Sequence, residues 1–214
     1  MSLEEILKMW REEWRVPANL SGQDIINFWA TEYRPHTLKV QTVMIYGAYF
    51  NINTLIETGT YRGDMVQATL NQFQKIYSIE LDPTLFIRAK IKFAPYPHTN
   101  ILLGDSGKVL PRILQSIYEP CVFWLDGHYI PLTLDTAKGN VDTPIMQELA
   151  AILDHPIKNH VILIDDARCF IGPNKVLKNY PTIKELKDLV AYKRSDLKFV
   201  VEDDIIRIYP NHKS

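Results

Sequence analysis

The sequence predicts an α/β protein with a doubly wound, mostly parallel sheet of seven strands and an antiparallel hairpin at one edge. From residue 54 onward, five short apolar runs rich in β-branched residues alternate with helical stretches. Each run is nearly continuous in hydrophobicity, as strands buried on both faces of a parallel sheet are. Each run also ends beside an acidic residue or a glycine. Because ligands bind outside the carboxyl ends of the strands in such sheets, these five polar ends predict one shared crevice.

The predicted elements follow in regular order along the chain. A strand–helix alternation of this kind is typical of a parallel sheet with crossover helices. The last two apolar runs are separated by Asp203-Asp204, which is typical of a tight hairpin turn. The five predicted parallel strands are Thr54–Glu57, Ile76–Glu80, Asn100–Leu103, Val122–Leu125 and Val161–Ile164; the hairpin strands are Phe199–Glu202 and Ile205–Tyr209; the helices are Asp64–Gln74, Thr84–Phe93, Gly107–Ser116, Thr143–Leu153 and Thr182–Leu189.

The first fifty residues differ from the rest and are predicted to form a helical cap. Apolar residues recur at helical spacing over Leu3–Trp14, and a sequence resembling a capping box begins at Ser21. A third apolar segment, Leu38–Phe50, is less clearly periodic. We therefore expect a helical cap segment over residues 1–50, covering the substrate side of the crevice, and a ligand-binding domain over residues 51–214.

Composition excludes several classes of partner. The 214 residues suit one domain, with 46% hydrophobic and 23% charged residues and a net charge of −1. This balance gives no reason to expect nucleic acid or an anionic membrane as a partner. No run of 18 apolar residues predicts a spanning helix, and the early charges are unlike a secretory signal. Because Cys121 and Cys169 give no disulfide framework, a cytoplasmic setting is expected, and the sequence leaves the oligomeric state open.

A glycine turn between the first strand and the next helix is the strongest motif. It reads Ile56-Glu57-Thr58-Gly59-Thr60-Tyr61-Arg62-Gly63-Asp64, and Glu80 follows Gly59 by 21 residues, a spacing that suits a carboxylate on ribose hydroxyls. Tyr61 occupies the place where the dinucleotide fingerprint has a glycine that approaches a pyrophosphate. The pattern therefore favours S-adenosylmethionine, which has an adenosine but no phosphate, over NAD. The alternative is a plain strand–turn–helix corner whose strands end in acidic residues by chance.

The stretch from Glu57 to Asp166 resembles the class I S-adenosylmethionine-dependent methyltransferases. The acidic residue and glycines of the family's turn match Glu57, Gly59 and Gly63, and its ribose-binding acid matches Glu80. The resemblance implies a Rossmann-like methyltransferase sheet closed by the antiparallel hairpin, with S-adenosylmethionine as cofactor. The cofactor-binding residues that it implies are Glu57, Thr58, Gly59, Thr60, Gly63, Glu80, Asp82, Asp105, Ser106 and Asp126.

A narrower resemblance is to the metal-dependent O-methyltransferases of the catechol and macrolide-sugar type. In these enzymes an aspartate ends the fourth strand and an acidic pair ends the fifth, which here correspond to Asp126 and to Asp165 and Asp166. The resemblance implies that these three carboxylates hold Mg²⁺, for which carboxylate oxygens are suitable ligands. Such an ion would hold an acceptor hydroxyl and lower its pKa. The alternative is one buried aspartate that caps a turn and one solvated aspartate.

His128 is the candidate general base, with Asp126 as its catalytic partner. The catechol enzymes place a lysine shortly after the first metal aspartate, whereas here the nearest polar candidate is His128, two residues after Asp126. Residues i and i+2 of an extended segment point to the same side, and histidine suits proton transfer near neutral pH. The alternative is a histidine bonded to a nearby backbone group. The chain between Asp126 and Asp165 is longer than in the compact catechol-type enzymes and is expected to form a loop over the acceptor site.

Together these features predict methyl transfer from S-adenosylmethionine to a hydroxyl of a small molecule, such as a sugar or a natural-product intermediate, assisted by a divalent cation. Two other functions stay open, because a fold does not determine a function. One is a methyltransferase-like binding module that has lost catalysis. The other is a different nucleotide-binding enzyme on the same architecture.

Overall fold

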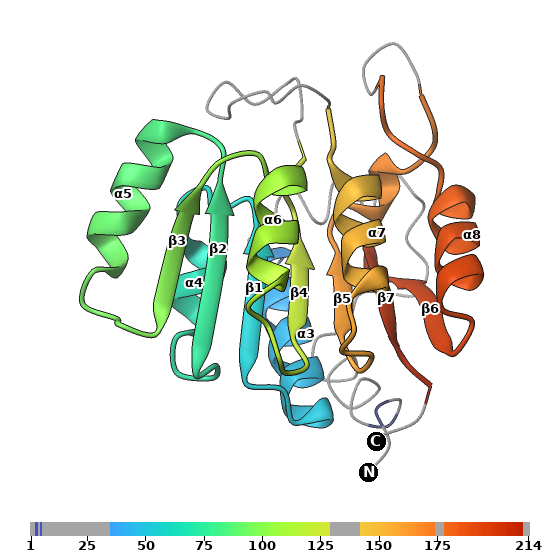
Figure 1. The fold of residues 1–214 in the computed structure, drawn as a ribbon, viewed down its shortest axis with the longest axis horizontal. Helices are drawn as coiled ribbons and strands as arrows, with labels where there is room; N and C mark the ends of the chain where they lie inside the picture. Colours follow the sequence, from blue (N-terminus) through green and yellow to red (C-terminus); the bar gives the residue numbers. More distant parts are fainter. Residues whose placement is uncertain (1–2, 4, 6–34, 129–141, 174–177, 212–214) are drawn as a thin grey trace.

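The computed structural model describes residues 35–128, 142–173 and 178–211, together with Leu3 and Glu5 (Figure 1). The predicted helix that begins at Ser21, and most of the predicted helix Leu3–Trp14, lie outside the described residues. So does the greater part of the predicted loop over the acceptor site, residues 129–141.

A seven-stranded sheet forms the centre of the molecule, with the strand order β3-β2-β1-β4-β5-β7-β6. The strands from β1 to β5 are mutually parallel, and β7 is antiparallel to both β5 and β6. Asp203 and Asp204, with φ of 53° and 62°, make the tight turn between β6 and β7. The predicted doubly wound sheet with an edge hairpin is therefore confirmed. The strands are β1 (Thr54–Thr58), β2 (Lys75–Glu80), β3 (Thr99–Leu103), β4 (Val122–Leu125), β5 (Val161–Ile164), β6 (Leu197–Glu202) and β7 (Ile205–Pro210).

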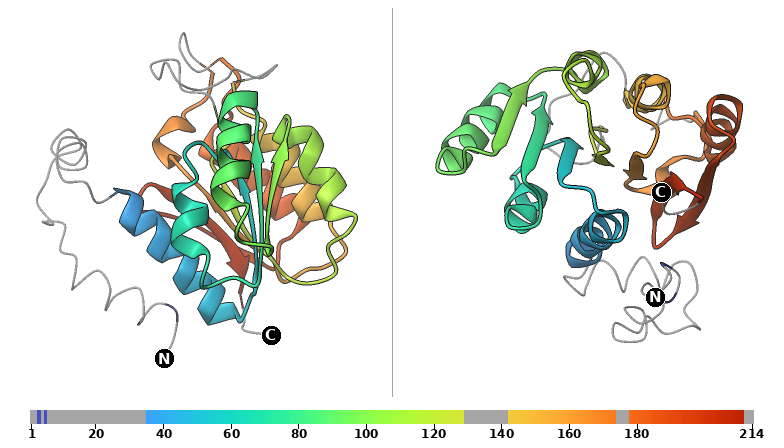
Figure 2. Two further views of the ribbon diagram at one scale, coloured as in Figure 1. Left: turned by 90° about the vertical axis from the view of Figure 1, so that its left-hand side faces the viewer. Right: turned by 60° about the horizontal axis from the view of Figure 1, so that its bottom comes forward.

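Helices cover both faces of the sheet (Figure 2). One face carries α3 (Pro35–Phe50), α4 (Asp64–Thr69) and α5 (Pro83–Phe93), and their apolar residues pack with alternate residues of the strands. The other face carries α6 (Ser106–Leu114), α7 (Ile145–Asp154) and α8 (Ile183–Lys193), and a short 3-10 helix, η1 (Ala167–Cys169), follows β5. No helix in these described parts of the chain is long and apolar enough to cross a membrane.

Two of the five predicted helices differ in length from the observed ones by more than one residue. The helix predicted to reach Gln74 ends at Thr69, because the chain turns there and Gln74 bonds back to the carbonyl oxygen of Asn53 at the start of β1. The helix predicted to end at Leu189 continues to Lys193 as α8. A capping box at its start, where the Thr182 hydroxyl accepts a hydrogen bond from the Glu185 backbone, stabilises this helix.

Helix α3 packs on the sheet itself. Val43 and Tyr46 are almost fully buried, and the Tyr46 ring meets the Tyr209 ring of β7 edge to face. The helix contacts β4 and β5, so its amino-terminal turns lie close to the carboxyl ends of those strands. The helical cap of residues 1–50 remains a prediction for the residues that precede α3.

The strand order reverses between β1 and β4. From β1 the chain moves outward to β2 and β3 on one side, and then returns to β4 and β5 on the other side. In an open α/β sheet, the loops diverge at this point and leave a crevice at the carboxyl ends of the two strands. The polar strand ends predicted from the sequence therefore meet around the ends of β1 and β4.

Candidate functional site

The glycine turn after β1 has a left-handed backbone at three of its residues. Gly59 and Gly63 have φ of 84° and 74°, and Tyr61 between them has φ of 48°. Two features exclude a side chain at Gly59. The positive φ disfavours any residue other than glycine, and a Cβ would lie 2.4 Å from the backbone oxygen of Asp126. The close approach brings the glycine turn directly against the end of β4.

Glu80 ends β2 and is held by the two loops on either side of it. Its Oε2 accepts a hydrogen bond of 2.7 Å from the backbone N–H of Tyr61, and its Oε1 accepts one of 2.8 Å from the N–H of Asp82. The side chain is buried. Since each carboxylate oxygen can accept two hydrogen bonds, each has capacity for one more donor. The carboxylate is thus fixed in orientation and suited to a pair of neighbouring hydroxyls.

Two other predicted cofactor residues also begin helices. Asp82 Oδ1 accepts hydrogen bonds from the backbone of Thr84 and Leu85 at the start of α5. Asp105 Oδ1 accepts one from the backbone N–H of Gly107 at the start of α6. Each aspartate therefore uses one oxygen as an N-cap. Ser106, the first residue of α6, is buried beside Gly127.

Glu57 lies inside the molecule at the end of β1. Its carboxyl group accepts a hydrogen bond from Ser78 of β2, and the Ser78 hydroxyl is 2.6 Å from that of Thr60. Burial raises the pKa of Glu57 to about 8, against the opposing effect of the Ser78 hydrogen bond. Thr60 and Glu57, both predicted cofactor residues, are thus joined through one serine below the glycine turn.

The raised pKa of Glu57 predicts a specific pH dependence of stability. In the folded protein Glu57 keeps its proton up to about pH 8, whereas the unfolded chain releases it above about pH 4.5. The stability that this proton contributes is therefore complete below about pH 4.5 and is lost as the pH rises to about 8. Glu57→Gln imitates the protonated acid, so its free energy of unfolding relative to wild type should rise by on the order of 4–5 kcal/mol over that interval. Urea unfolding at a series of pH values measures this; parallel curves for the two proteins would contradict it.

Asp126, His128 and Asp166 form a group at the carboxyl ends of β4 and β5. One ligand atom from each residue lies within 4.8 Å of those from the other two. His128 Nε2 is 3.1 Å from Asp166 Oδ2, and its Nδ1 is 3.7 Å from Asp126 Oδ1. The imidazole is 4% exposed and meets the Tyr180 ring edge to face. The structure therefore brings the predicted base and both strand ends together.

Asp165 and Asp166 both contact Lys39 but differ in their other partners. The Asp165 carboxylate accepts a hydrogen bond of 2.5 Å from Lys39 of α3 and another from the backbone N–H of Asp166. Asp166 adopts a left-handed backbone conformation, with φ of 54°, which turns its side chain toward His128 and Arg168. Of the three predicted metal ligands, Asp126 and Asp166 thus share a group with His128. Asp165 pairs with Lys39, and its carboxyl group is also in hydrogen-bond contact with Asp126.

Lys39 and Arg168 belong to this group, although the sequence patterns did not single them out. Burial alone would raise the pKa of Asp166, but the hydrogen bond with His128 and the positive charges of Lys39 and Arg168 hold it well below its usual range. Burial would lower the pKa of Lys39, but the carboxylates of Asp165, Asp166 and Asp126 raise it above its usual value. The available signal was a lysine inside an otherwise apolar helical segment.

Glu148 was also missed. This residue of α7 is 1% exposed, near the hydroxyl groups of Ser106 and Thr58. Burial raises its pKa to about 7, while the two hydroxyls act in the opposite direction. A Cβ on Gly127 would lie 3.1 Å from each of these hydroxyl oxygens. The two hydroxyls therefore lie directly against the segment that connects Asp126 and His128. A single glutamate in the apolar part of a helix was the available signal.

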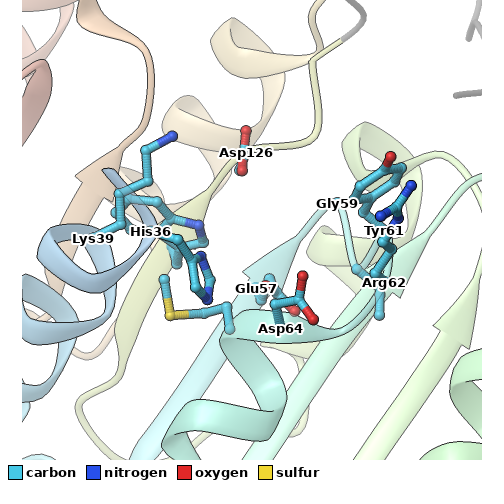
Figure 3. Close-up of a pocket in the computed structure, with 11 residues that line it drawn as sticks. His36, Lys39, Glu57, Gly59, Tyr61, Arg62, Asp64 and Asp126 are labelled. Atoms are coloured by element: carbon cyan, nitrogen blue, oxygen red, sulfur yellow. The ribbon is translucent and has the colours of Figure 1, made fainter. Parts of the chain in front are cut away.

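A pocket of about 370 Å³ opens at the switch point, on the side of the sheet that carries α3 and α4. Figure 3 shows side chains from α3 facing the strand ends across it, with Tyr61 and Arg62 at the other side. Both acidic and basic side chains line the pocket. Its lining includes His36 and Lys39 of α3, Glu57 and Gly59 at the end of β1, and Trp124 and Asp126 at the end of β4.

Comparisons with known proteins agree with the fold. No family model matches the sequence, and no curated protein matches it. Among solved structures, the O-methyltransferase TomG from Streptomyces achromogenes, involved in tomaymycin synthesis and solved with SAM, is 12% identical with a TM-score of 0.58 over 98% of each chain. An O-methyltransferase from Bacillus cereus in complex with SAH is 14% identical, with a TM-score of 0.54 over 97% of this chain and 90% of that one. A putative caffeoyl-CoA O-methyltransferase from Staphylococcus aureus is also 14% identical, with a TM-score of 0.54 over 98% of this chain and 92% of that one.

Because the sequence identities are low, these similarities show a shared fold. The shared architecture extends over nearly the whole chain, including the sheet and its edge hairpin. The chain has the Rossmann-like fold of the class I S-adenosylmethionine-dependent methyltransferases.

Proposed function

We propose that the protein transfers a methyl group from S-adenosylmethionine to a hydroxyl of a small molecule. The observation that carries this proposal is the Glu80 carboxylate, fixed by the backbone of Tyr61 and Asp82 beside the glycine turn. It supports recognition of a ribose diol at the end of β2. Structural neighbours with this fold include O-methyltransferases solved with SAM or SAH.

The charges of the pocket support the choice of cofactor. Glu57, Asp64 and Asp126 line it. Glu57 keeps its proton at neutral pH, but ionised carboxylates at Asp64 and Asp126 would repel a pyrophosphate and attract a sulfonium and an ammonium group. His36 and Lys39 line the same pocket and can pair with a carboxylate. S-adenosylmethionine carries all three of these charged groups. When bound, it supplies a methyl group on a positively charged sulfur.

His128 is proposed as the residue that accepts the proton of the acceptor hydroxyl. The hydrogen bond between His128 Nε2 and Asp166 places the imidazole proton on Nε2 when the ring is neutral, because a carboxylate can only accept. Nδ1 then has a free lone pair on the side of Asp126. Asp166 would thus orient the ring, and Nδ1 would take the proton as the new C–O bond forms.

The same residues fit a divalent cation. Asp126, His128 and Asp166 offer two carboxylates and one imidazole within 4.8 Å of one another. Carboxylate ligands suit Mg²⁺ and Mn²⁺, and the imidazole favours a transition metal such as Mn²⁺ over Mg²⁺. Bound there, the cation would supply Lewis acidity toward the acceptor hydroxyl. In that case His128 would act as a ligand that positions the acceptor.

Removal of divalent cations is expected to abolish methyl transfer without removing the cofactor. The proposed cation ligands lie at the ends of β4 and β5, whereas Glu80 lies at the end of β2. Excess EDTA should therefore stop turnover, while calorimetry with S-adenosylhomocysteine shows little change in affinity. Unchanged turnover in EDTA would restrict Asp126 and Asp166 to proton transfer and structural roles.

Methyl transfer itself is tested with labelled cofactor. The purified chain is incubated with S-adenosylmethionine labelled in its methyl group and with a panel of hydroxylated sugars and phenols. Labelled product and S-adenosylhomocysteine are the expected result. Binding of S-adenosylhomocysteine with no product from any acceptor would favour a binding module instead. Binding of NAD in place of S-adenosylhomocysteine would contradict the cofactor assignment.

A further inference from the structure

Lys39 brings a positive charge to the strand ends from a helix that precedes the whole sheet. Its Nζ lies 2.5 Å from Asp165 Oδ2 and 3.4 Å from Asp166 Oδ1. The lysine side chain is 24% exposed, whereas the two carboxylate side chains are 1% and 7% exposed. The ammonium group therefore neutralises charge that is almost completely removed from water.

Asp166 belongs both to this ion pair and to the group with Asp126 and His128. One of its oxygens faces Lys39 and Arg168, and the other faces His128. A divalent cation held by Asp126, His128 and Asp166 would therefore share a carboxylate with the Lys39 ammonium. The cation and the ammonium group would then repel each other strongly, because the effective dielectric constant of a partly buried site is far below that of water.

Lys39 also has space to move. Its side chain lines the pocket at the switch point, and Figure 3 shows it reaching from α3 toward Asp126. Lysine has a flexible four-carbon stem and a single point charge. The ammonium can therefore leave the carboxylates for the pocket without any change in the helix that carries it.

We propose that Lys39 and a divalent cation compete for the carboxylates at the ends of β4 and β5, so that Lys39 sets the cation affinity of this site. The proposal rests on the proposed function in one respect, the assignment of Asp126, His128 and Asp166 as cation ligands. Lys39 keeps the carboxylates neutralised when the cation is absent, and binding of the cation displaces it.

The test measures Mn²⁺ binding to the full chain by electron paramagnetic resonance, with neither cofactor nor acceptor present. Lys39→Met removes the competing charge, and its affinity for Mn²⁺ should exceed that of wild type by about tenfold or more, which is about 1.4 kcal/mol. Lys39→Arg keeps the charge and should bind Mn²⁺ no more tightly than wild type. Lys39→Gln, which is neutral but can still donate to Asp165, should behave like Lys39→Met and replaces it if that variant fails to fold.

Lys75→Met is the matched control, because Lys75 forms a lysine–carboxylate pair of 2.8 Å with Glu119, outside the group at the ends of β4 and β5. It should bind Mn²⁺ as wild type does. Equal affinities of wild type and the neutral Lys39 variants would overturn the proposal, as would the absence of Mn²⁺ binding in all of them. Because the measurement needs no cofactor, failure to bind S-adenosylhomocysteine would count against the proposed function and leave this result unaffected.

Discussion

Glu80→Ala should weaken the binding of S-adenosylhomocysteine by about 10- to 100-fold. A hydrogen bond to a charged group contributes roughly 1.5–3 kcal/mol, and each tenfold change in affinity corresponds to about 1.4 kcal/mol. The N–H groups of Tyr61 and Asp82 already hold this carboxylate in one orientation, so ligand binding costs little side-chain entropy at Glu80. Isothermal titration calorimetry on the folded variant measures the loss.

The same substitution also removes the acceptor for the Tyr61 N–H. Part of the effect could therefore come from a displaced glycine turn, and Glu80→Gln separates the two contributions. The amide keeps one acceptor oxygen and a similar shape, but loses the negative charge and one acceptor. Glu80→Gln should lose less affinity than Glu80→Ala, because its amide oxygen still accepts from one of the two backbone N–H groups. An unchanged affinity in Glu80→Ala would remove Glu80 from the cofactor site.

The predicted parallel strands, the edge hairpin and the crevice at the strand ends followed from simple patterns. Continuous apolar runs such as Val161–Ile164 can only be buried on both faces, and this requirement gives parallel strands with covering helices. The tight turn at Asp203 and Asp204 was predictable because short polar residues tolerate a positive φ. Helix ends were less predictable, because the end of α4 depends on where the chain must turn back to begin β2.

The site was predicted in part, because spacing along the chain gives the position of a residue but not the direction of its side chain. The sequence placed Asp165 and Asp166 together, and both reach Lys39, yet only Asp166, with its left-handed backbone, also bonds to His128. The contact between Lys39 and Asp165 could not be predicted, since it spans 126 residues and depends on how α3 packs. Glu148 likewise meets Thr58 and Ser106 only because α7 lies against that face of the sheet.

The two carboxylates of the acidic pair therefore have separate consequences for chemistry. Asp165 fixes Lys39, and through it the charge of the cleft, whereas Asp166 fixes the orientation of His128. An Asp166→Asn variant keeps the shape of the side chain, but its amide nitrogen can donate to His128. It would then allow the tautomer with the proton on Nδ1, which is the wrong form for accepting a proton on the side of Asp126.

His128→Ala should lower the turnover rate of methyl transfer by about 10²- to 10⁴-fold if proton transfer limits the rate. The acceptor hydroxyl must lose a proton as its oxygen is methylated, and His128 Nδ1 faces Asp126 at the ends of β4 and β5, with the ring held by Asp166. The affinity for S-adenosylhomocysteine should change little, because Glu80 lies at the end of another strand. Asp166→Asn should also reduce turnover, but by a smaller factor, since the imidazole remains.

Steady-state rates measured over a range of pH test this prediction. The wild-type pH profile should contain the ionisation of the base, and the His128→Ala profile should lack it. Wild-type turnover with an unchanged pH profile in His128→Ala would exclude His128 from the mechanism and leave activation of the hydroxyl to the cation alone.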